Sequence, residues 1–86
     1  MHDSIQFQPR WKEELLATSK NGVLVFELTM GKLQVYFPDR DMWLARVPAW
    51  AKDQWEVYHN ACERWCAQQG IPFTVVSNGF VYELKG

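Results

Sequence analysis

The stretch VLVFELTMGKLQVYF, residues 23–37, decides the fold because it reads as two β-strands joined by a tight reversal. Successive side chains of a strand point to opposite faces, so residues two apart share a face. In the first half, the large apolar residues that share a face are Leu24, Phe26, Leu28 and Met30. Gly31 permits the reversal, and Lys32–Phe37 returns with the same alternation. The stretch therefore predicts a hairpin with one apolar face.

The residues before the hairpin predict a helix over Gln8–Ser19. Pro9 suits a first helical turn, and Trp11 and Leu15 have the i, i+4 spacing of one buried stripe. The segment ends in an Asn-Gly pair at Gly22, a combination that supplies the left-handed conformation common at helix ends.

The residues after the hairpin predict a short strand and then a long helix. Pro38 ends the second strand, and Met42–Val47 reads as a third strand joined to it by the turn at 39–41. Pro48 opens a helix that runs to Gln69 and ends at Gly70. Its apolar residues recur at steps of four and three: Ala51, Trp55, Tyr58, Cys62 and Trp65.

The C-terminal part of the chain predicts a second hairpin. Ile71–Ser77 is an apolar strand, Asn78-Gly79 is a strong hairpin signal, and Phe80–Lys85 alternates again. The predicted order is α-β-β-β-α-β-β over a single small domain, residues 1–86. We therefore expect an α/β or α+β domain, with a mixed sheet and a long amphipathic helix packed on it.

Composition narrows the classes of function. The chain is 48% hydrophobic and 15% aromatic, which predicts a folded domain rather than a disordered segment. Nine basic against ten acidic residues give a net charge of -1, which counts against a domain that binds nucleic acid by itself. The apolar runs are too short to span a membrane and the N-terminus lacks a signal-type segment, so we expect a cytoplasmic protein.

Three residues of the long helix raise the possibility of a zinc site: His59, Cys62 and Cys66. All are of types that bind zinc, and they lie on neighbouring faces of one helix. However, Cys62 falls within the apolar stripe, and free cysteine is among the residue types most often buried. We therefore favour a structural role for the two cysteines and expect no cofactor.

Aromatic and basic residues near the second strand predict an interaction surface. Trp43 and Trp50 lie outside the apolar stripe and close to Arg40 and Arg46. Exposed tryptophan and arginine are enriched at the energetic centres of protein interfaces, although a small core also uses tryptophan. The leading hypothesis is a small non-catalytic interaction or regulatory domain, possibly derived from a phage or mobile element. It binds a protein partner, and self-association stays open.

Three motifs resemble parts of the restriction-endonuclease-like, or PD-(D/E)xK, nucleases. YFPD (Tyr36–Asp39) is similar to the segment that leads into the first metal-binding aspartate of that family. LARVP (Leu44–Pro48) stands where the family has an acid-x-Lys strand. ACERWCAQQGIPFTVVSN (Ala61–Asn78) is similar to the helix-to-strand step of Holliday-junction-resolvase and transposon-end-cleaving members. The resemblance extends over roughly residues 9–78 and implies an α-β-β-β-α-β core.

The resemblance also implies a site at which two carboxylates hold Mg²⁺ and a lysine positions the attacking water. Ala45 stands where the second acid belongs, and Val47 stands where the lysine belongs. The residues that remain are Asp39 as the first acid, Glu13 or Glu14 as the helix acid, and Asp41 and Lys52 as substitutes. The alternative hypothesis is therefore a Mg²⁺-dependent nuclease, or an inactive remnant of one, centred on Asp39.

Overall fold

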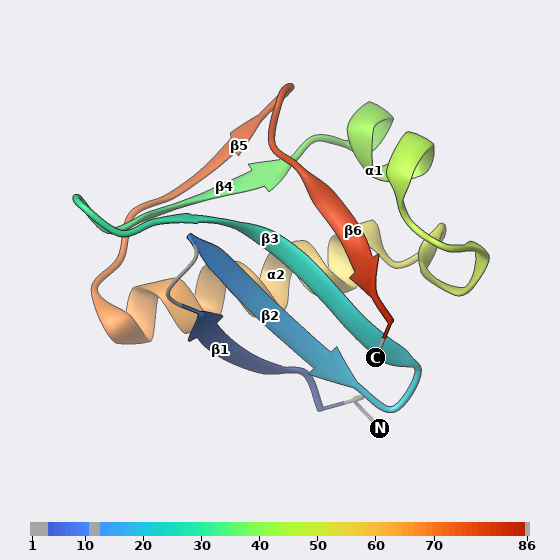
Figure 1. The fold of residues 1–86 in the computed structure, drawn as a ribbon, viewed down its shortest axis with the longest axis horizontal. Coiled ribbons are helices and arrows are strands. Elements are labelled where there is room, and N and C mark those ends of the chain that lie inside the picture. The colour runs from blue at the N-terminus through green and yellow to red at the C-terminus, as the bar shows by residue number, and fades with distance from the viewer. Residues whose placement is uncertain (1–3, 11–12, 86) are drawn as a thin grey trace.

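The sheet is built around one long central strand, β3 (Figure 1). The computed structural model describes residues 4–10 and 13–85. In chain order the elements are β1 (Gln6–Arg10), β2 (Glu14–Ser19), β3 (Gly22–Thr29), β4 (Gln34–Pro38), α1 (Arg40–Arg46), the 3₁₀ helix η1 (Ala49–Ala51), α2 (Trp55–Gln69), β5 (Phe73–Val76) and β6 (Val81–Leu84).

The strands form a mixed sheet in the order β1-β2-β3-β4-β5, with β6 as a second neighbour of β3. β6 runs beside the first half of β3, from Val23 to Phe26, and β4 runs beside its second half, from Glu27 to Thr29. The β4–β5 pair is parallel and the other pairs are antiparallel. The chain is therefore a small α+β domain, and the expected mixed sheet is confirmed.

The central hairpin is confirmed, and its apolar face forms the middle of the core. Leu24, Phe26 and Leu28 of β3 are fully buried, as are Val35 and Phe37 of β4. The rings of Phe26 and Phe37 stack with centroids 4.9 Å apart. Alternation along two antiparallel strands thus places these side chains on the same face, as the sequence predicts.

The helix predicted over Gln8–Ser19 is wrong, because β1 and β2 occupy this segment. Leu15 and Ala17, two residues apart, are both buried, which is the pattern of a strand. They pair with Phe26 and Leu24 of β3, and these contacts with the central strand outweigh the local preference for a helix. Pro9 is tolerated because β1 lies at the edge of the sheet. Trp11, which contributed to the helix prediction, lies outside the described residues.

The strand predicted over Met42–Val47 is also wrong, because residues 40–46 form helix α1. Asp39 caps this helix, and its side chain accepts a hydrogen bond of 2.9 Å from the backbone N–H of Met42. Trp43 and Val47, four residues apart, are both buried, which is the spacing of one helical face. The acidic turn is therefore the start of a helix.

The helix predicted from Pro48 to Gln69 is interrupted at its N-terminal end. η1 ends at Ala51, and α2 begins only at Trp55. The Ala51 carbonyl accepts hydrogen bonds from the Trp43 indole N–H, at 2.7 Å, and from the Gln54 N–H. These donors take the place of the N–H four residues on, which this carbonyl would bond in a continuous α-helix. The predicted end is correct: Gly70 adopts the left-handed conformation, with φ of 70°.

The predicted C-terminal hairpin is wrong, although its two strands exist. β5 pairs with β4 and β6 pairs with β3, so the strands on either side of Asn78-Gly79 diverge. The connection passes over the end of β4, where a Cβ on Gly79 would lie 3.1 Å from backbone atoms of Phe37 and Pro38. Glycine thus permits a close backbone crossing here rather than a two-residue turn.

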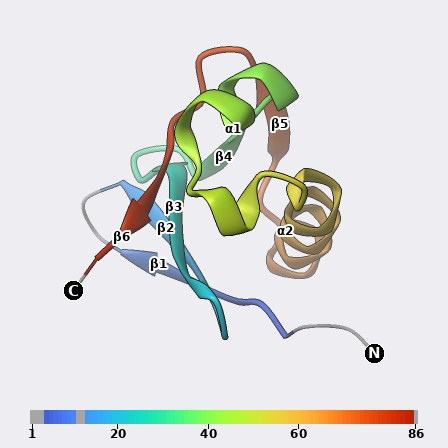
Figure 2. The ribbon, with the colours of Figure 1, turned by 90° about the vertical axis from the view of Figure 1, so that its right-hand side faces the viewer.

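The helices cover one face of the sheet, with α1, η1 and α2 on the same side (Figure 2). The core between them and the sheet includes Trp43, Ala51, Tyr58, Cys62 and Cys66. On the other face a polar cluster forms, in which Glu14 accepts hydrogen bonds from Arg10 and from the Tyr82 hydroxyl. No helix among the described residues is long and apolar enough to cross a membrane.

Candidate functional site

A shallow hollow opens where β4 and β5 end and α1 and α2 begin. Its volume is about 360 Å³, and its lining residues are Asp39, Arg40, Asp41, Trp55 and Val75. We call it the Arg40 hollow. Three of these residues are the cap and first two residues of α1, whereas α2 and β5 supply one each. The hollow thus combines residues that were expected to act separately, as metal ligands and as interface contacts, with two residues that were not expected at any site.

Trp55 lines the Arg40 hollow and is held in place by its neighbours. It is the first residue of α2, it is half-buried, and its indole N–H donates a 3.0 Å hydrogen bond to the Pro38 carbonyl. The His59 ring stacks on it, with centroids 4.7 Å apart. The guanidinium of Arg40 lies 4.3 Å from the Trp55 ring centroid, a cation–π contact. Trp55 is therefore an ordered part of the lining, held between its hydrogen bond and its two ring contacts.

Negative charge dominates the rim of the hollow. Asp39 caps α1, and Glu56 lies 3.5 Å from Arg40 in an ion pair whose side chains are 60% and 74% exposed, which solvent screens. Asp41 is exposed and has no ion-pair partner within the described part of the chain. Three carboxylates against one guanidinium give a formal charge of -2. The arrangement suits a ligand with an apolar part and a cationic part.

The four residues predicted to form an interface lie in different environments in the structure. Trp43 was expected at the surface, and this is wrong: it is fully buried and stacks against Phe26 and Phe37. Trp50 is half-buried and donates a 3.1 Å hydrogen bond to Glu83. Arg46 is exposed in the last turn of α1. Of the four, Arg40 lines the hollow.

The candidate nuclease residues are only partly brought together. Asp39 and Asp41 line the same hollow, but Glu13 and Lys52 are not among its lining residues. Glu13 lies at the β1–β2 turn, with φ of 63°, and its carbonyl accepts the N–H of Leu28. The Lys52 ammonium donates to the Leu44 carbonyl at the other end of α1. The hydrogen bond to α1 already occupies one oxygen of Asp39.

The candidate zinc residues face different surroundings. The His59 ring packs edge-on against Phe73 and Phe37 and stacks on Trp55, whereas Cys62 and Cys66 are buried in the core. The hydrogen bond between the two thiols, together with burial, raises the pKa of Cys62. Among residues 4–10 and 13–85, no three side chains of the usual metal-binding types converge.

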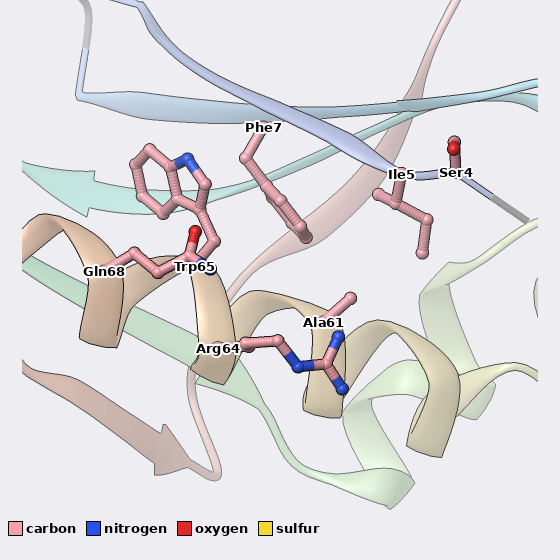
Figure 3. Close-up of a pocket in the computed structure, with 7 residues that line it drawn as sticks. All are labelled: Ser4, Ile5, Phe7, Ala61, Arg64, Trp65 and Gln68. Carbon is pink, nitrogen blue, oxygen red and sulfur yellow. The ribbon is translucent and has the colours of Figure 1, made fainter. Parts of the chain in front are cut away.

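A second hollow, of about 300 Å³, lies between β1 and α2 (Figure 3). Phe7 points from the strand toward the helix and Trp65 points back, with ring centroids 5.8 Å apart. Ile5, Phe7 and Trp65 pack against the main core, and Arg64 lies at the margin. This hollow is the seam where the edge strand meets the helix, and its apolar residues already stabilise the fold.

Sequence reasoning missed Trp55 and Val75 as members of a site, and it considered His59 only as a zinc ligand. Trp55 was assigned to the apolar stripe of a longer helix, and Val75 to the interior of a strand. No local pattern indicates that α2 begins at Trp55 or that β5 lies at the sheet edge. The chain matches no family model, no curated protein and no solved structure.

Proposed function

We propose that this chain is a small non-catalytic interaction domain that binds a protein partner through the Arg40 hollow. The observation that carries the proposal is the Arg40–Trp55 stack, which lies at an open hollow beside the exposed side chain of Val75. Arginine and tryptophan contribute most of the binding energy at many protein interfaces.

The order of the hollow supports this proposal. The hydrogen bond from Trp55 to Pro38 and the stacked His59 fix the indole before any partner arrives. A partner therefore does not have to immobilise this side chain, and the entropic cost of binding falls. With a volume of about 360 Å³ and a wide opening, the hollow accommodates one or two side chains of a larger partner.

Selection of peptides from a random display library tests the proposal. Purified protein is the target, and the affinity of each selected peptide is then measured for wild type, Arg40→Ala and Arg64→Ala. Arg64 is the matched control, because this arginine lines the second hollow instead. We expect peptides that lose roughly tenfold or more in affinity with Arg40→Ala and little with Arg64→Ala. A library that yields no binder, or binders sensitive only to Arg64→Ala, contradicts the proposal.

A second candidate function is Mg²⁺-dependent cleavage of DNA, or a remnant of that activity. The observation in its favour is that Asp39 and Asp41 line one hollow. Incubation with branched and linear DNA in Mg²⁺ or Mn²⁺ tests it, with Asp41→Asn as the loss-of-function variant because Asp41 has no capping role. We expect no cleavage. Cleavage by the wild type that Asp41→Asn abolishes would replace the interaction proposal with the nuclease.

A further inference from the structure

Strand β5 is an open edge of the sheet. Among the described residues β5 pairs only with β4, and it forms the outer border of the sheet in Figure 1. The carbonyls of Pro72 and Val76 accept hydrogen bonds from the N–H groups of Val35 in β4 and of Asp39 just after it, at 3.0 and 3.1 Å. Backbone groups alternate in direction along a strand, so the N–H and C=O groups of Phe73 and Val75 point away from β4. These groups are available to another strand.

This edge also lacks the usual protection against pairing. Proteins guard edge strands with charged residues or proline, which disfavour the addition of another strand. The other terminal strand, β1, contains Pro9 and Arg10. In contrast, residues 71–82 contain no charged side chain, and Pro72 precedes β5 rather than lying within it. β6, which pairs only with β3, contains Glu83, so β5 is the least protected of the three edges among the described strands.

The open edge and the Arg40 hollow are continuous. Val75 belongs to both: it is 39% exposed at the edge and it lines the hollow. A strand added beside β5 would place alternate side chains on the same face as Val75, which is the face of Trp55 and Arg40. The backbone of a partner and its side chains would thus be recognised at adjacent places.

Charge selects the kind of partner. The rim of the hollow carries a formal charge of -2, from Asp39, Asp41 and Glu56 against Arg40. A lysine or arginine of an added strand would meet Asp41, which has no ion-pair partner in the described part of the chain. A second copy of this chain would bring an equally negative rim and no charge of its own on β5, so like charges disfavour pairing between copies.

We propose that the partner is an extended, basic peptide segment that adds to β5 as a further strand and directs a lysine or arginine into the Arg40 hollow. This inference rests on the proposed function, because it specifies how the same hollow is used. Backbone hydrogen bonds to Phe73 and Val75 supply the pairing, and the carboxylate rim supplies the preference for positive charge.

Designed peptides test both parts. The probe is a fluorescein-labelled peptide of alternating lysine and valine, and its affinity is measured by fluorescence polarisation. Two further versions carry N-methyl groups, one on the lysine amides and one on the valine amides. Only one set of amides faces β5 in an added strand, so we expect one version to lose about tenfold or more in affinity and the other to keep it. A version with glutamate in place of lysine should bind at least about tenfold more weakly than the lysine peptide.

Matched variants locate the binding. Val75→Lys places a charge on the edge and should abolish binding, whereas Val57→Lys, at a valine of α2 that is 46% exposed, should not. Asp41→Asn should weaken the lysine peptide, whereas Glu63→Gln, which changes net charge equally on an exposed part of α2, should not. Hydrogen exchange at the amides of Phe73 and Val75 should slow when the peptide binds.

The outcomes separate this inference from the proposed function. If both N-methylated peptides bind as tightly as the parent while Asp41→Asn weakens binding, the strand addition is wrong and the hollow is still the binding site. If the glutamate peptide binds as well as the lysine peptide, the charge preference is wrong. If sedimentation shows a dimer that Val75→Lys dissociates, the occupant of the edge is a second copy and the peptide proposal fails.

Discussion

Replacing Trp43 by phenylalanine should destabilise the domain strongly, because this indole connects α1, η1 and the sheet. Trp43 is fully buried and stacks against Phe26 and Phe37, with centroids 6.1 and 5.8 Å away. Its indole N–H donates a 2.7 Å hydrogen bond to the carbonyl of Ala51, the residue at which η1 ends before α2 begins. Phenylalanine keeps most of the stacking but removes one ring and the donor.

The magnitude follows from three contributions. The residual cavity, of about 40 Å³, costs roughly 1 kcal/mol at about 24 cal/mol per Å³. The apolar surface no longer buried costs about 1 kcal/mol more. The Ala51 carbonyl keeps its hydrogen bond from the Gln54 N–H, so loss of the indole donor costs only about 0.5–1.5 kcal/mol. The expected loss is therefore roughly 3 kcal/mol, against a total stability of roughly 4–13 kcal/mol for a chain of 86 residues.

Urea denaturation followed by circular dichroism measures this loss. With a slope of about 1–2 kcal/mol per molar urea, the midpoint should fall by roughly 1.5–3 M. Leu44→Ala is the matched control, since Leu44 follows Trp43 in α1 but is 52% exposed and should change stability by less than about 0.5 kcal/mol. Equal midpoints for the two variants would refute the assignment of Trp43 to the core and return it to the surface.

Three other substitutions test local features. Asp39→Ala should cost about 1 kcal/mol by removing the cap of α1, and Asp39→Ser should restore most of it in the same urea assay. Gly79→Ala should lower the melting temperature, since its Cβ would lie 3.1 Å from the backbone of β4, whereas Gly31→Ala, with no atom within 4 Å, should not. The hydrogen bond to Glu14 raises the pKa of Tyr82, so folding favours the protonated phenol. The resulting contribution to the stability of the folded state is present below the ordinary tyrosine pKa of about 10, and it is lost as the pH rises through the folded-state pKa. The difference between the ultraviolet titrations of wild type and Tyr82→Phe should show that Tyr82 ionises late, and Glu14→Gln should return its pKa toward the ordinary range.

Local sequence patterns predicted part of the candidate site. The sequence singles out residues 38–50 as a segment where charged and aromatic residues gather, and in the structure Asp39, Arg40 and Asp41 line a hollow. The role of each residue could not be predicted. Asp39 serves as a helix cap, and Trp43 faces the core because residues 40–46 form a helix rather than a strand. Side-chain directions repeat every two residues in a strand and every 3.6 residues in a helix, so a change from strand to helix changes which side chains share a face.

The sequence by itself determined the elements whose apolar pattern is strong and whose ends are marked. The hairpin at 23–37 and the end of the long helix at Gly70 are of this kind, because alternation and a left-handed glycine act over a few residues. Only the tertiary structure decided that Gln8–Ser19 pairs with β3 instead of forming a helix, and that β5 joins β4 while β6 joins β3. These outcomes depend on contacts between residues far apart in the chain, which outweigh local propensities of a few tenths of a kcal/mol. The open edge at β5 and the hollow beside it are products of that pairing.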